Sequence, residues 1–550
     1  MLHFLGHLNL LLTCATAEMH LTNRLEAVHE VQTWLFREVV SETLLRDLKA
    51  KFSDASLLDR PMLHRAQVLF AIRLVATHGT PDGGNKLVER RDFDAIGDLL
   101  FLINGLFHPE PLTSDAAKAL WLATQMGPIY ELENPPDVEL AWPRTQELLS
   151  VRFPQAAHNA AELRRLEQVS DTTGFNMQAW IDLSWMLFSY WVAVSFKELM
   201  KNRGRGYLNP AQPHEVISSE SLQRALKGLA VGFDDLPSHL RIDAFSGSTL
   251  FDLSRFRIKP LWLMPDGLVL CIDPVMLLER LGPHVFWSVM NALDSKAARH
   301  QFTGTWGKAF ENYSLDVLGT VFRAKKWLYT RNPIDARTNE ELADATAVRD
   351  GTAIVVECKG TFITSANKYS GRPTPFMRGL TQKFGRSKHG GVYQLVRTIS
   401  RVWYAKTSSD AVAHSEKATD VFPILVLQDP IFACGPVARV LSDRFQVGIG
   451  RARRKVSHNT PTVWPLTIIT ADELDWLGAA VSVSNARLDA LLKRFHRLYP
   501  SRMISLGEFL SSNTADFFPS DRVRESINHR FRTKTEGTLK RFKNGDYGGQ

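Results

Sequence analysis

The chain of 550 residues has a formal net charge of +8, and it is 44% hydrophobic and 23% charged. This composition excludes wholesale disorder, collagen and low-complexity fibres, and the length predicts roughly two to four domains. The basic balance is compatible with a polyanionic partner. The four cysteines, Cys14, Cys271, Cys358 and Cys434, lie far apart. This spacing argues against a disulfide scaffold or a structural zinc site and favours a reducing compartment.

Two apolar runs raise the question of targeting. Residues 1–17 are apolar and end in small residues, as a signal peptide does, but no Lys or Arg precedes the apolar core. The alternatives to secretion are an N-terminal helix and a start at Met19, so residues 1–19 are treated as an extension. The run 183–196 holds 14 uncharged residues, fewer than the roughly 20 that a spanning helix needs. We expect a buried core helix there and a soluble cytoplasmic protein.

Residues 20–239 carry apolar residues at three- and four-residue spacing, which predicts a helical domain. The predicted helices are 21–51, 64–77, 92–106, 114–126, 156–169 and 177–200. Clusters of turn-forming residues separate them, and the pattern indicates no strand and no repeat of fixed period. We expect this domain to serve in sensing, regulation or oligomerisation.

From residue 240 short strand-like runs alternate with helices. A hairpin is predicted at 257–264 and 268–273, further strands at 342–359, 422–428 and 463–469, and helices at 275–293, 305–318, 391–405 and 471–496. This order predicts an α/β domain with a central mixed sheet over residues 240–515. Residues 516–550 form a basic tail that we expect to be flexible or to dock on a partner.

The strand pair at 342–359 carries two acids at one end. Asp350-Gly351 predicts a type I′ turn, which needs positive φ at both central positions. The register that follows places Asp344 opposite Glu357. Side chains so opposed have Cβ atoms ~4.5–5.5 Å apart, and like charges there destabilise the pair. A divalent cation would turn this repulsion into binding, because Mg²⁺ takes carboxylate oxygens together with several waters.

A lysine and a third acid complete the pattern. Lys359 lies two residues after Glu357 and therefore points to the same sheet face. An acid and a lysine at the end of an apolar strand are costly without a function. Such a lysine can orient or deprotonate metal-bound water and stabilise charge on a phosphoryl group. In helix 305–318, Glu311 falls outside the polar face, which suits an acid that reaches the same metal.

The pattern of Glu311, Asp344 and Glu357-Cys358-Lys359 resembles the PD-(D/E)XK nuclease superfamily, which has the restriction-endonuclease-like fold, over roughly residues 300–430. The resemblance implies that Asp344 and Glu357 bind the metal, that Lys359 is catalytic and that Glu311 is the acid on the first core helix. It also implies that the Cys358 carbonyl faces the metal. Two positions depart from the pattern: Ala343 replaces the proline of the name, and no tyrosine stands four residues after the glutamine discussed next.

Gln394 is similar to a glutamine that some branches of the superfamily carry on the following helix. It is the fifth residue to which we assign a role in catalysis. The simpler alternative is a glutamine on the surface of a helix. For the acids and the lysine, the alternatives are an ion-paired strand end in a non-catalytic sheet and a salt bridge from Glu311 to Lys308 or Arg323.

The basic charge can be localised next to these acids. No Asp or Glu occurs between Cys358 and Ser409, and much of residues 364–390 reads as a loop. A basic loop beside a metal site suits a phosphate backbone, because each Lys or Arg contact releases counterions. The residues predicted to bind nucleic acid are Lys368, Arg372, Arg378, Lys383, Arg386 and Lys388. A merely solvated face is the alternative.

Together these features predict a Mg²⁺-dependent nuclease in which Mn²⁺ can substitute. The resemblance favours DNA over RNA, and by analogy it suggests defence against foreign (including viral) DNA. One alternative is a non-catalytic nucleic-acid-binding or assembly protein that keeps the fold. Another is a protein-interaction platform in the helical half, through which the chain would form a homo-oligomer or bind a protein partner.

Overall fold

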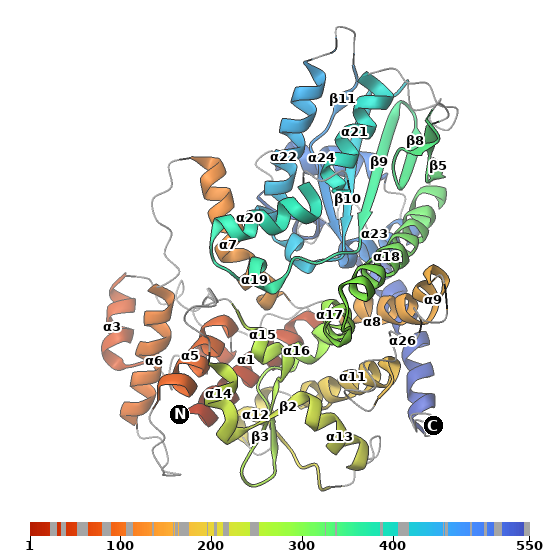
Figure 1. Ribbon diagram of the computed structural model, residues 1–550. Coiled ribbons are helices and arrows are strands. Elements are labelled where there is room, and N and C mark those ends of the chain that lie inside the picture. Colours follow the sequence, from red (N-terminus) through yellow and green to blue (C-terminus); the bar gives the residue numbers. More distant parts are fainter. Residues whose placement is uncertain are drawn as a thin grey trace.

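The computed structural model describes the chain with defined gaps. The residues outside the description are 23–29, 35–39, 52–63, 80–89, 106–113, 135–136, 158, 160–162, 164–174, 195, 203–205, 213–218, 242–251, 325, 336–337, 386–388, 405–416, 455, 457–459, 484–486, 500–502, 511–519 and 544–550. Figure 1 shows a sheet covered by helices in the upper part and a mostly helical region below it. Helices combined with mixed sheets are the class that the sequence predicts.

The helical region follows the apolar spacing in part, because the helix expected at 21–51 is interrupted at residues 40–41. Its longer helices are α1 (Leu2–Thr22), α3 (Glu42–Lys51), α5 (Arg65–His78), α6 (Arg90–Gly105), α7 (Asp115–Glu133), α8 (Val138–Glu147), α11 (Met177–Ala193), α12 (Phe196–Lys201) and α13 (Ser219–Leu229). Short pieces, η1 (Leu148–Arg152) and α9 (Phe153–Ala156), continue α8. Helix α8 was not predicted, and most of the helix expected at 156–169 lies outside the described residues.

Both apolar runs are core helices. In α1, Leu5, Leu8 and Leu10 are buried, and α1 packs against α5 and α11. In α11, Trp191 is buried and its indole N–H donates to the carbonyl of Gly206 at 3.0 Å. No helix in the described part of the chain combines the length and the apolar character needed to cross a membrane.

A small sheet joins the two halves of the sequence. Its strands β1 (Tyr207–Leu208), β2 (Ala230–Gly232), β3 (Leu261–Leu263) and β4 (Val269–Cys271) lie in the order β1-β4-β3-β2. The β3–β4 hairpin is confirmed, with Gly267 at φ 80° in its turn. The boundary expected at 239/240 and the strand-free reading of residues 20–239 are wrong, because β1 and β2 pair with β4 and β3. Two- and three-residue strands are too short to show an alternating pattern.

Five short helical pieces accompany the small sheet: the first two lie between β2 and β3, and the other three follow β4. They are α14 (Leu236–Leu240), α15 (Ser254–Ile258), α16 (Val275–Leu278), η4 (Glu279–Leu281) and α17 (Pro283–Ala292). The single helix expected at 275–293 is broken at Gly282-Pro283. Helix α18 (Lys296–Ala324) follows and is longer at both ends than the predicted 305–318.

The larger sheet has six strands. They are β5 (Leu328–Arg331), β8 (Ala345–Arg349), β9 (Thr352–Lys359), β10 (Asp420–Leu427), β11 (Thr462–Val463) and β12 (Thr467–Thr470). Strand β8 pairs antiparallel with both β5 and β9, whereas β9, β11 and β12 pair parallel with β10. A separate two-stranded hairpin, β6 (Ile334–Asp335) and β7 (Glu340–Glu341), precedes β8.

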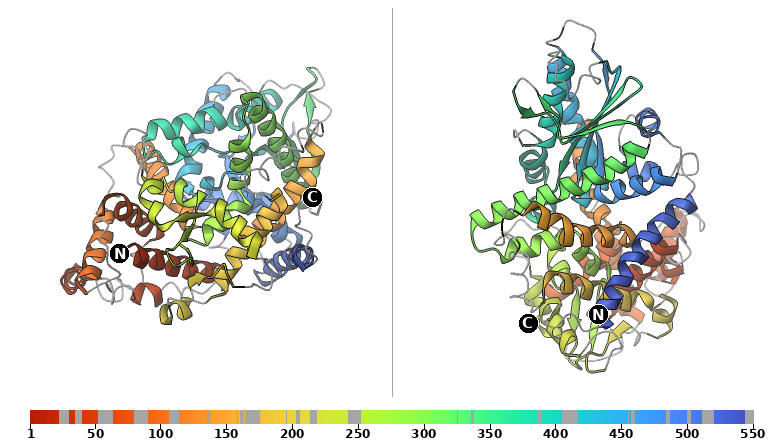
Figure 2. Two further views of the ribbon diagram at one scale, coloured as in Figure 1. Left: turned by 60° about the horizontal axis from the view of Figure 1, so that its bottom comes forward. Right: turned by 90° about the vertical axis from the view of Figure 1, so that its right-hand side faces the viewer.

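Helices cover both faces of this sheet (Figure 2). One face packs on α18, α23 (Ala471–Val483), α24 (Leu488–Leu498) and α26 (Ser520–Lys543), joined by Leu140 of α8. The other face packs on α20 (Pro373–Leu380), α21 (Gly391–Ile399) and α22 (Gly435–Arg453), joined by Ala123 of α7. Two helices from the N-terminal region, α7 and α8, therefore contribute side chains to the hydrophobic cores on the two faces of the sheet.

Two segments differ from their predicted states. Much of the expected loop 364–390 is helical: α19 (Ser365–Lys368), α20 and the π-helix η5 (Thr381–Gly385) occupy it. Pro373 starts α20, and Phe376 and Leu380 bury its apolar side. The basic tail contains α26, which packs on α8 and α23 through buried Val523 and Ile527. Because basic residues dominate the composition of this segment, the sequence pattern did not indicate its narrow apolar stripe.

Candidate active site

The β8–β9 hairpin has the predicted register. Asp350 and Gly351 have φ of 47° and 73°, as a type I′ turn requires. The ladder pairs Ala345 with Val356, so Asp344 comes one position beyond it, opposite Glu357. Turn chemistry and the two-residue period thus bring the two acids to one end of neighbouring strands.

Both acids are buried, and each has a partner within the chain. One Asp344 oxygen, Oδ2, accepts a hydrogen bond from the backbone N–H of Cys358 at 2.6 Å. Glu357 is 1% exposed, and its Oε2 lies 3.1 Å from Nζ of Lys359. Burial, followed by the charge of Asp344, raises the pKa of Glu357 well above its ordinary value. The carboxylates of Asp344 and Glu357 therefore repel each other in the folded chain.

Lys359 lies on the same face as Glu357 and remains charged. Burial opposes the ammonium form, but the carboxylates of Glu357 and Asp344 outweigh burial, so the pKa of Lys359 is raised. A lysine held in this form donates hydrogen bonds and supplies positive charge. Such an ammonium is able to orient a water or to stabilise an oxyanion, but it cannot act as a base at neutral pH.

Helix α18 brings Glu311 to the same end of the sheet. A Cβ built on Gly360, directly after β9, would lie 2.7 Å from Cβ of Phe310. This glycine lets the end of β9 approach the helix one residue from Glu311. Burial and the charge of Asp344 raise the pKa of Glu311. Glu311 also pairs with Lys308 at 2.5 Å, so the expected alternative, a salt bridge, is present as well.

A fourth acid, Glu341, was missed by the sequence analysis. It lies at the end of β7, and its pKa is raised by burial and then by the charges of Asp344 and Glu311. The hairpin that carries it is tied to α21 and to the π-helix η6 (Ser400–Tyr404) that continues it, because Arg397 and Arg401 pair with Glu340. Its position three residues before Asp344 was a signal in the sequence, but two-residue strands gave no pattern by which to place it.

Gln394 lies on the helix that covers Lys359. At the first residue of α21, a Cβ on Gly391 would stand 3.4 Å from Cγ of Lys359, and Gln394 follows three residues later. Its side-chain oxygen Oε1 is buried and has no hydrogen-bond partner among the described residues. A buried polar atom without a partner needs an explanation, and the role predicted for Gln394 stays a prediction.

The basic residues predicted to bind nucleic acid divide into different environments. The assignment of Lys368 is wrong: it is 4% exposed and binds Glu131 at 3.1 Å and Asp429 at 2.6 Å. Arg372 and Arg378 are exposed at either end of α20, and Lys383 is half-buried. Arg386 and Lys388 lie outside the described residues. The exposed positive charge near the site is therefore smaller than the sequence implies.

The donor set was tested for a metal ion. Among the described residues, no group of three or more His, Cys, Asp or Glu side chains is arranged to hold one. Asp344 and Glu357 form a pair of carboxylates on adjacent strands, with the Cys358 N–H turned to Asp344. Two carboxylates suit a Mg²⁺ ion that keeps most of its water shell. A role for the Cys358 carbonyl stays a prediction.

Comparisons of this chain with protein-family models, with curated proteins and with solved structures find no match. Its function is therefore inferred from its own residues.

Proposed function

We propose that this chain is a metal-dependent nuclease that hydrolyses phosphodiester bonds. The observation that carries the proposal is the convergence of Glu311, Asp344, Glu357 and Lys359 at one end of the central strands, from elements far apart in sequence. Burial and the charge of Asp344 raise the pKa of both Glu311 and Glu357, and buried acids perturbed in this way are typical of functional sites. The restriction-endonuclease-like fold is part of this proposal: the acids come from a hairpin, the upstream acid from the helix before it and the glutamine from the helix after it.

In this proposal each residue has a separate task. Asp344 and Glu357 would hold Mg²⁺, which supplies Lewis-acid activation of a phosphoryl oxygen and of water. Lys359, an ammonium 3.1 Å from Glu357, donates to the attacking water or to the phosphoryl oxygen on which charge grows. Glu311 and Glu341 accept hydrogen bonds from water at the rim, and the unpaired Gln394 oxygen offers a further acceptor.

Two exposed arginines support a nucleic-acid substrate. Arg372 and Arg378 lie on the segment directly after β9 and α19, and exposed guanidinium groups bind phosphate strongly. The preference for DNA and a role in defence rest on the resemblance alone. Action in the cytoplasm is part of the same proposal.

The test compares wild type with Lys359→Ala and Glu357→Gln on supercoiled plasmid, linear duplex, single-stranded DNA and RNA, with Mg²⁺, Mn²⁺ or EDTA. Matched controls are Lys227→Ala and Glu525→Gln, which alter exposed residues of α13 and α26. We expect metal-dependent cleavage that falls by at least about a hundredfold in both site variants, a typical loss for a catalytic group. Unchanged cleavage in both site variants would disprove the assignment.

The alternative is a nucleic-acid-binding or assembly protein without catalysis. The exposed Arg372 and Arg378 favour it equally. It would give salt-sensitive binding of duplex that is unaffected by Lys359→Ala, with no cleavage under any metal condition.

A further inference from the structure

A large cavity lies apart from the acids, at the junction between the sheet and the helical region. Its volume is about 980 Å³, at the upper end of the range for small-molecule sites. It opens onto the carboxyl ends of the parallel strands, where Gln428 follows β10 and Thr470 ends β12. Ligands of open α/β sheets bind at these ends. None of Glu311, Asp344 and Glu357 lines it.

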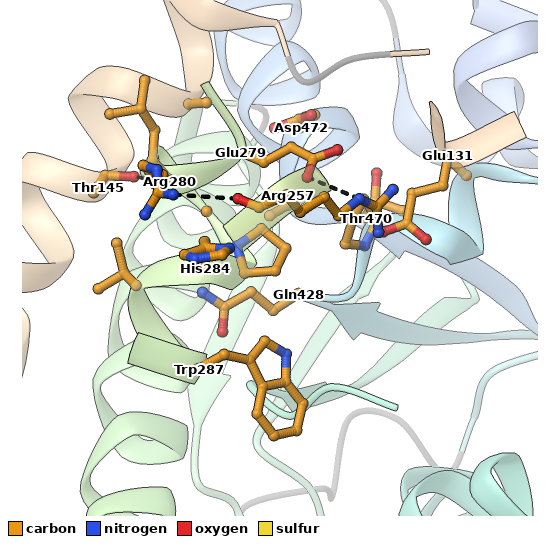
Figure 3. Close-up of a pocket in the computed structure, with 18 of the residues that line it drawn as sticks. Glu131, Thr145, Arg257, Glu279, Arg280, His284, Trp287, Gln428, Thr470 and Asp472 are labelled. Carbon is orange, nitrogen blue, oxygen red and sulfur yellow. Dashed lines mark hydrogen bonds and ion pairs between the residues drawn. The ribbon is translucent and has the colours of Figure 1, made fainter. Parts of the chain in front are cut away.

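One wall carries a buried arginine that no carboxylate binds (Figure 3). Arg280 is 4% exposed, and its Nη2 donates to the backbone carbonyls of Arg257 at 3.2 Å and Ile258 at 2.8 Å. Its guanidinium lies 5.4 Å from the ring centre of Trp180. Nε and Nη1 bond to no other described residue. A buried charge without a counter-ion is costly, so an anionic ligand would stabilise it.

Acidic side chains also line the cavity, but each is already bound within the chain. The pairs are Glu131 with Lys368, Asp137 with the Glu139 amide, Glu279 with Arg257, Asp472 with Arg144, Glu473 with the Thr470 amide and Glu508 with the Ser505 amide. Among the described cations of the lining, Arg144, Arg257 and Lys368 are ion-paired and Arg280 is not. This local charge favours an anion at that wall.

Groups that recognise a planar ring lie close by. His284 is the second residue of α17, four residues after Arg280, and burial together with the charges of Arg280 and Arg257 lowers its pKa well below the ordinary value. Its neutral imidazole can both donate and accept. Trp287 and Trp306 also line the cavity, and the indole N–H of Trp306 donates to Oε1 of Gln428 at 2.7 Å. Indole rings offer faces on which a nucleobase stacks.

We propose that this cavity binds a nucleotide, with its phosphate at Arg280 and His284 and its base against the partly exposed ring of Trp287. Arg280 supplies a guanidinium fork that suits phosphate, and the volume is sufficient for a base, a sugar and phosphates. The cavity also adjoins the proposed active site, because the backbone N–H of Gln428, a lining residue, donates to the backbone carbonyl of Lys359 at 3.4 Å. A bound nucleotide would therefore act next to the lysine, a regulatory role that rests on the proposed function.

The experiment measures equilibrium binding to the full chain by calorimetry, in EDTA so that metal at the acids plays no part. The probes are AMP, ATP, GTP, CTP, adenosine and inorganic phosphate. At least one nucleotide should bind at least about tenfold more tightly than adenosine and phosphate. Arg280→Met should weaken that nucleotide about tenfold or more, while Arg255→Met, on exposed Arg255 of α15, leaves it unchanged. His284→Gln is a second variant for use if Arg280→Met does not fold.

Two results would overturn the proposal. One is the absence of binding for every nucleotide at millimolar concentration. The other is binding that adenosine matches or that both site variants leave unchanged, which would place the ligand elsewhere. Because binding is measured without catalysis, an inactive nuclease would still give a clear answer here.

Discussion

At the residue scale, the buried acids make stability depend on pH in a specific direction. The pKa of Glu357 is raised in the folded chain by burial and by Asp344. Its contribution to folding stability is therefore complete at acid pH, below the ordinary pKa of the unfolded carboxyl, and is lost as the pH rises. Glu357→Gln should stabilise the metal-free protein by about 0.5–2 kcal/mol at pH 8, with a smaller gain at pH 5. Denaturant unfolding in EDTA at both pH values measures this.

The exposed carboxylate of Glu525 provides the comparison. Glu525→Gln should change the free energy of unfolding little at either pH. A gain for Glu357→Gln that shrinks as the pH rises would contradict the buried, repelling pair. A stable but inactive variant would show that the site keeps its acids for function at a cost in stability.

Lys368 shows what a charge pattern in sequence cannot reveal. It reads as part of a basic run, yet it lies between Glu131 and Asp429, and Glu131 is 237 residues away along the chain. Lys368→Ala should destabilise the protein by about 3–5 kcal/mol, because two buried acids lose their cation. Denaturant unfolding measures this loss.

Arg378→Ala is the contrasting change. Arg378 is exposed, so its loss should leave stability within about 0.5 kcal/mol and weaken duplex binding at low salt. Equal stability of the Lys368 and Arg378 variants would argue against the buried network.

At the scale of elements, the approach of β9 to α18 assembles the site. Gly360→Ala would place a Cβ 2.7 Å from Cβ of Phe310 and 3.2 Å from Cα of Gly307. We expect a loss of about 1–3 kcal/mol and reduced cleavage, because Glu311 moves away from Asp344. Thermal unfolding and the plasmid assay measure the two effects.

Gly304 on the same helix is the matched control. A Cβ there would meet no atom within 4 Å. Gly304→Ala should therefore stabilise α18 by about 0.5–1 kcal/mol, through helix propensity alone. If Gly360→Ala were tolerated as well as Gly304→Ala, the close approach would not be needed.

Elements with local signals were predictable from sequence. The pair Asp350-Gly351 sets the hairpin turn, and the two-residue period then places Asp344 opposite Glu357. Glu341 was missed because its hairpin is held by distant contacts, among them the pairing of Glu340 with Arg397. Helix α20 was taken as a loop because Gly and Pro outweighed its short apolar stripe, which finds its partners only in the folded chain.

At the scale of the molecule, the two regions share their cores. Helix α7 packs on α22, where a Cβ on Gly127 would lie 3.0 Å from Val437, and α8 packs on α23 and α26. We expect residues 295–550 alone to expose these apolar faces, to bind a hydrophobic dye and to lack cooperative thermal unfolding. Coexpression with residues 1–294 should restore a soluble complex. A cooperatively folding 295–550 fragment would contradict this.

The shared cores explain why the domain boundary predicted at residues 239/240 does not separate two independently packed regions. The sequence pattern changes near residue 240 from helices alone to alternating strands and helices. Such a pattern indicates the local element type and carries no information on which elements pack together. The apolar faces of α7 and α8 look the same whether they cover helices or a sheet.

The shared cores also constrain how the polypeptide is made. Gly6 of α1 lies against Trp262 and Leu270. Helix α7 packs on α22, which is synthesised more than half the chain later. Helices synthesised first therefore keep apolar faces without their final partners until most of the chain has left the ribosome. We expect such a nascent chain to complete its folding after synthesis rather than domain by domain, with apolar faces that chaperones can bind in the meantime.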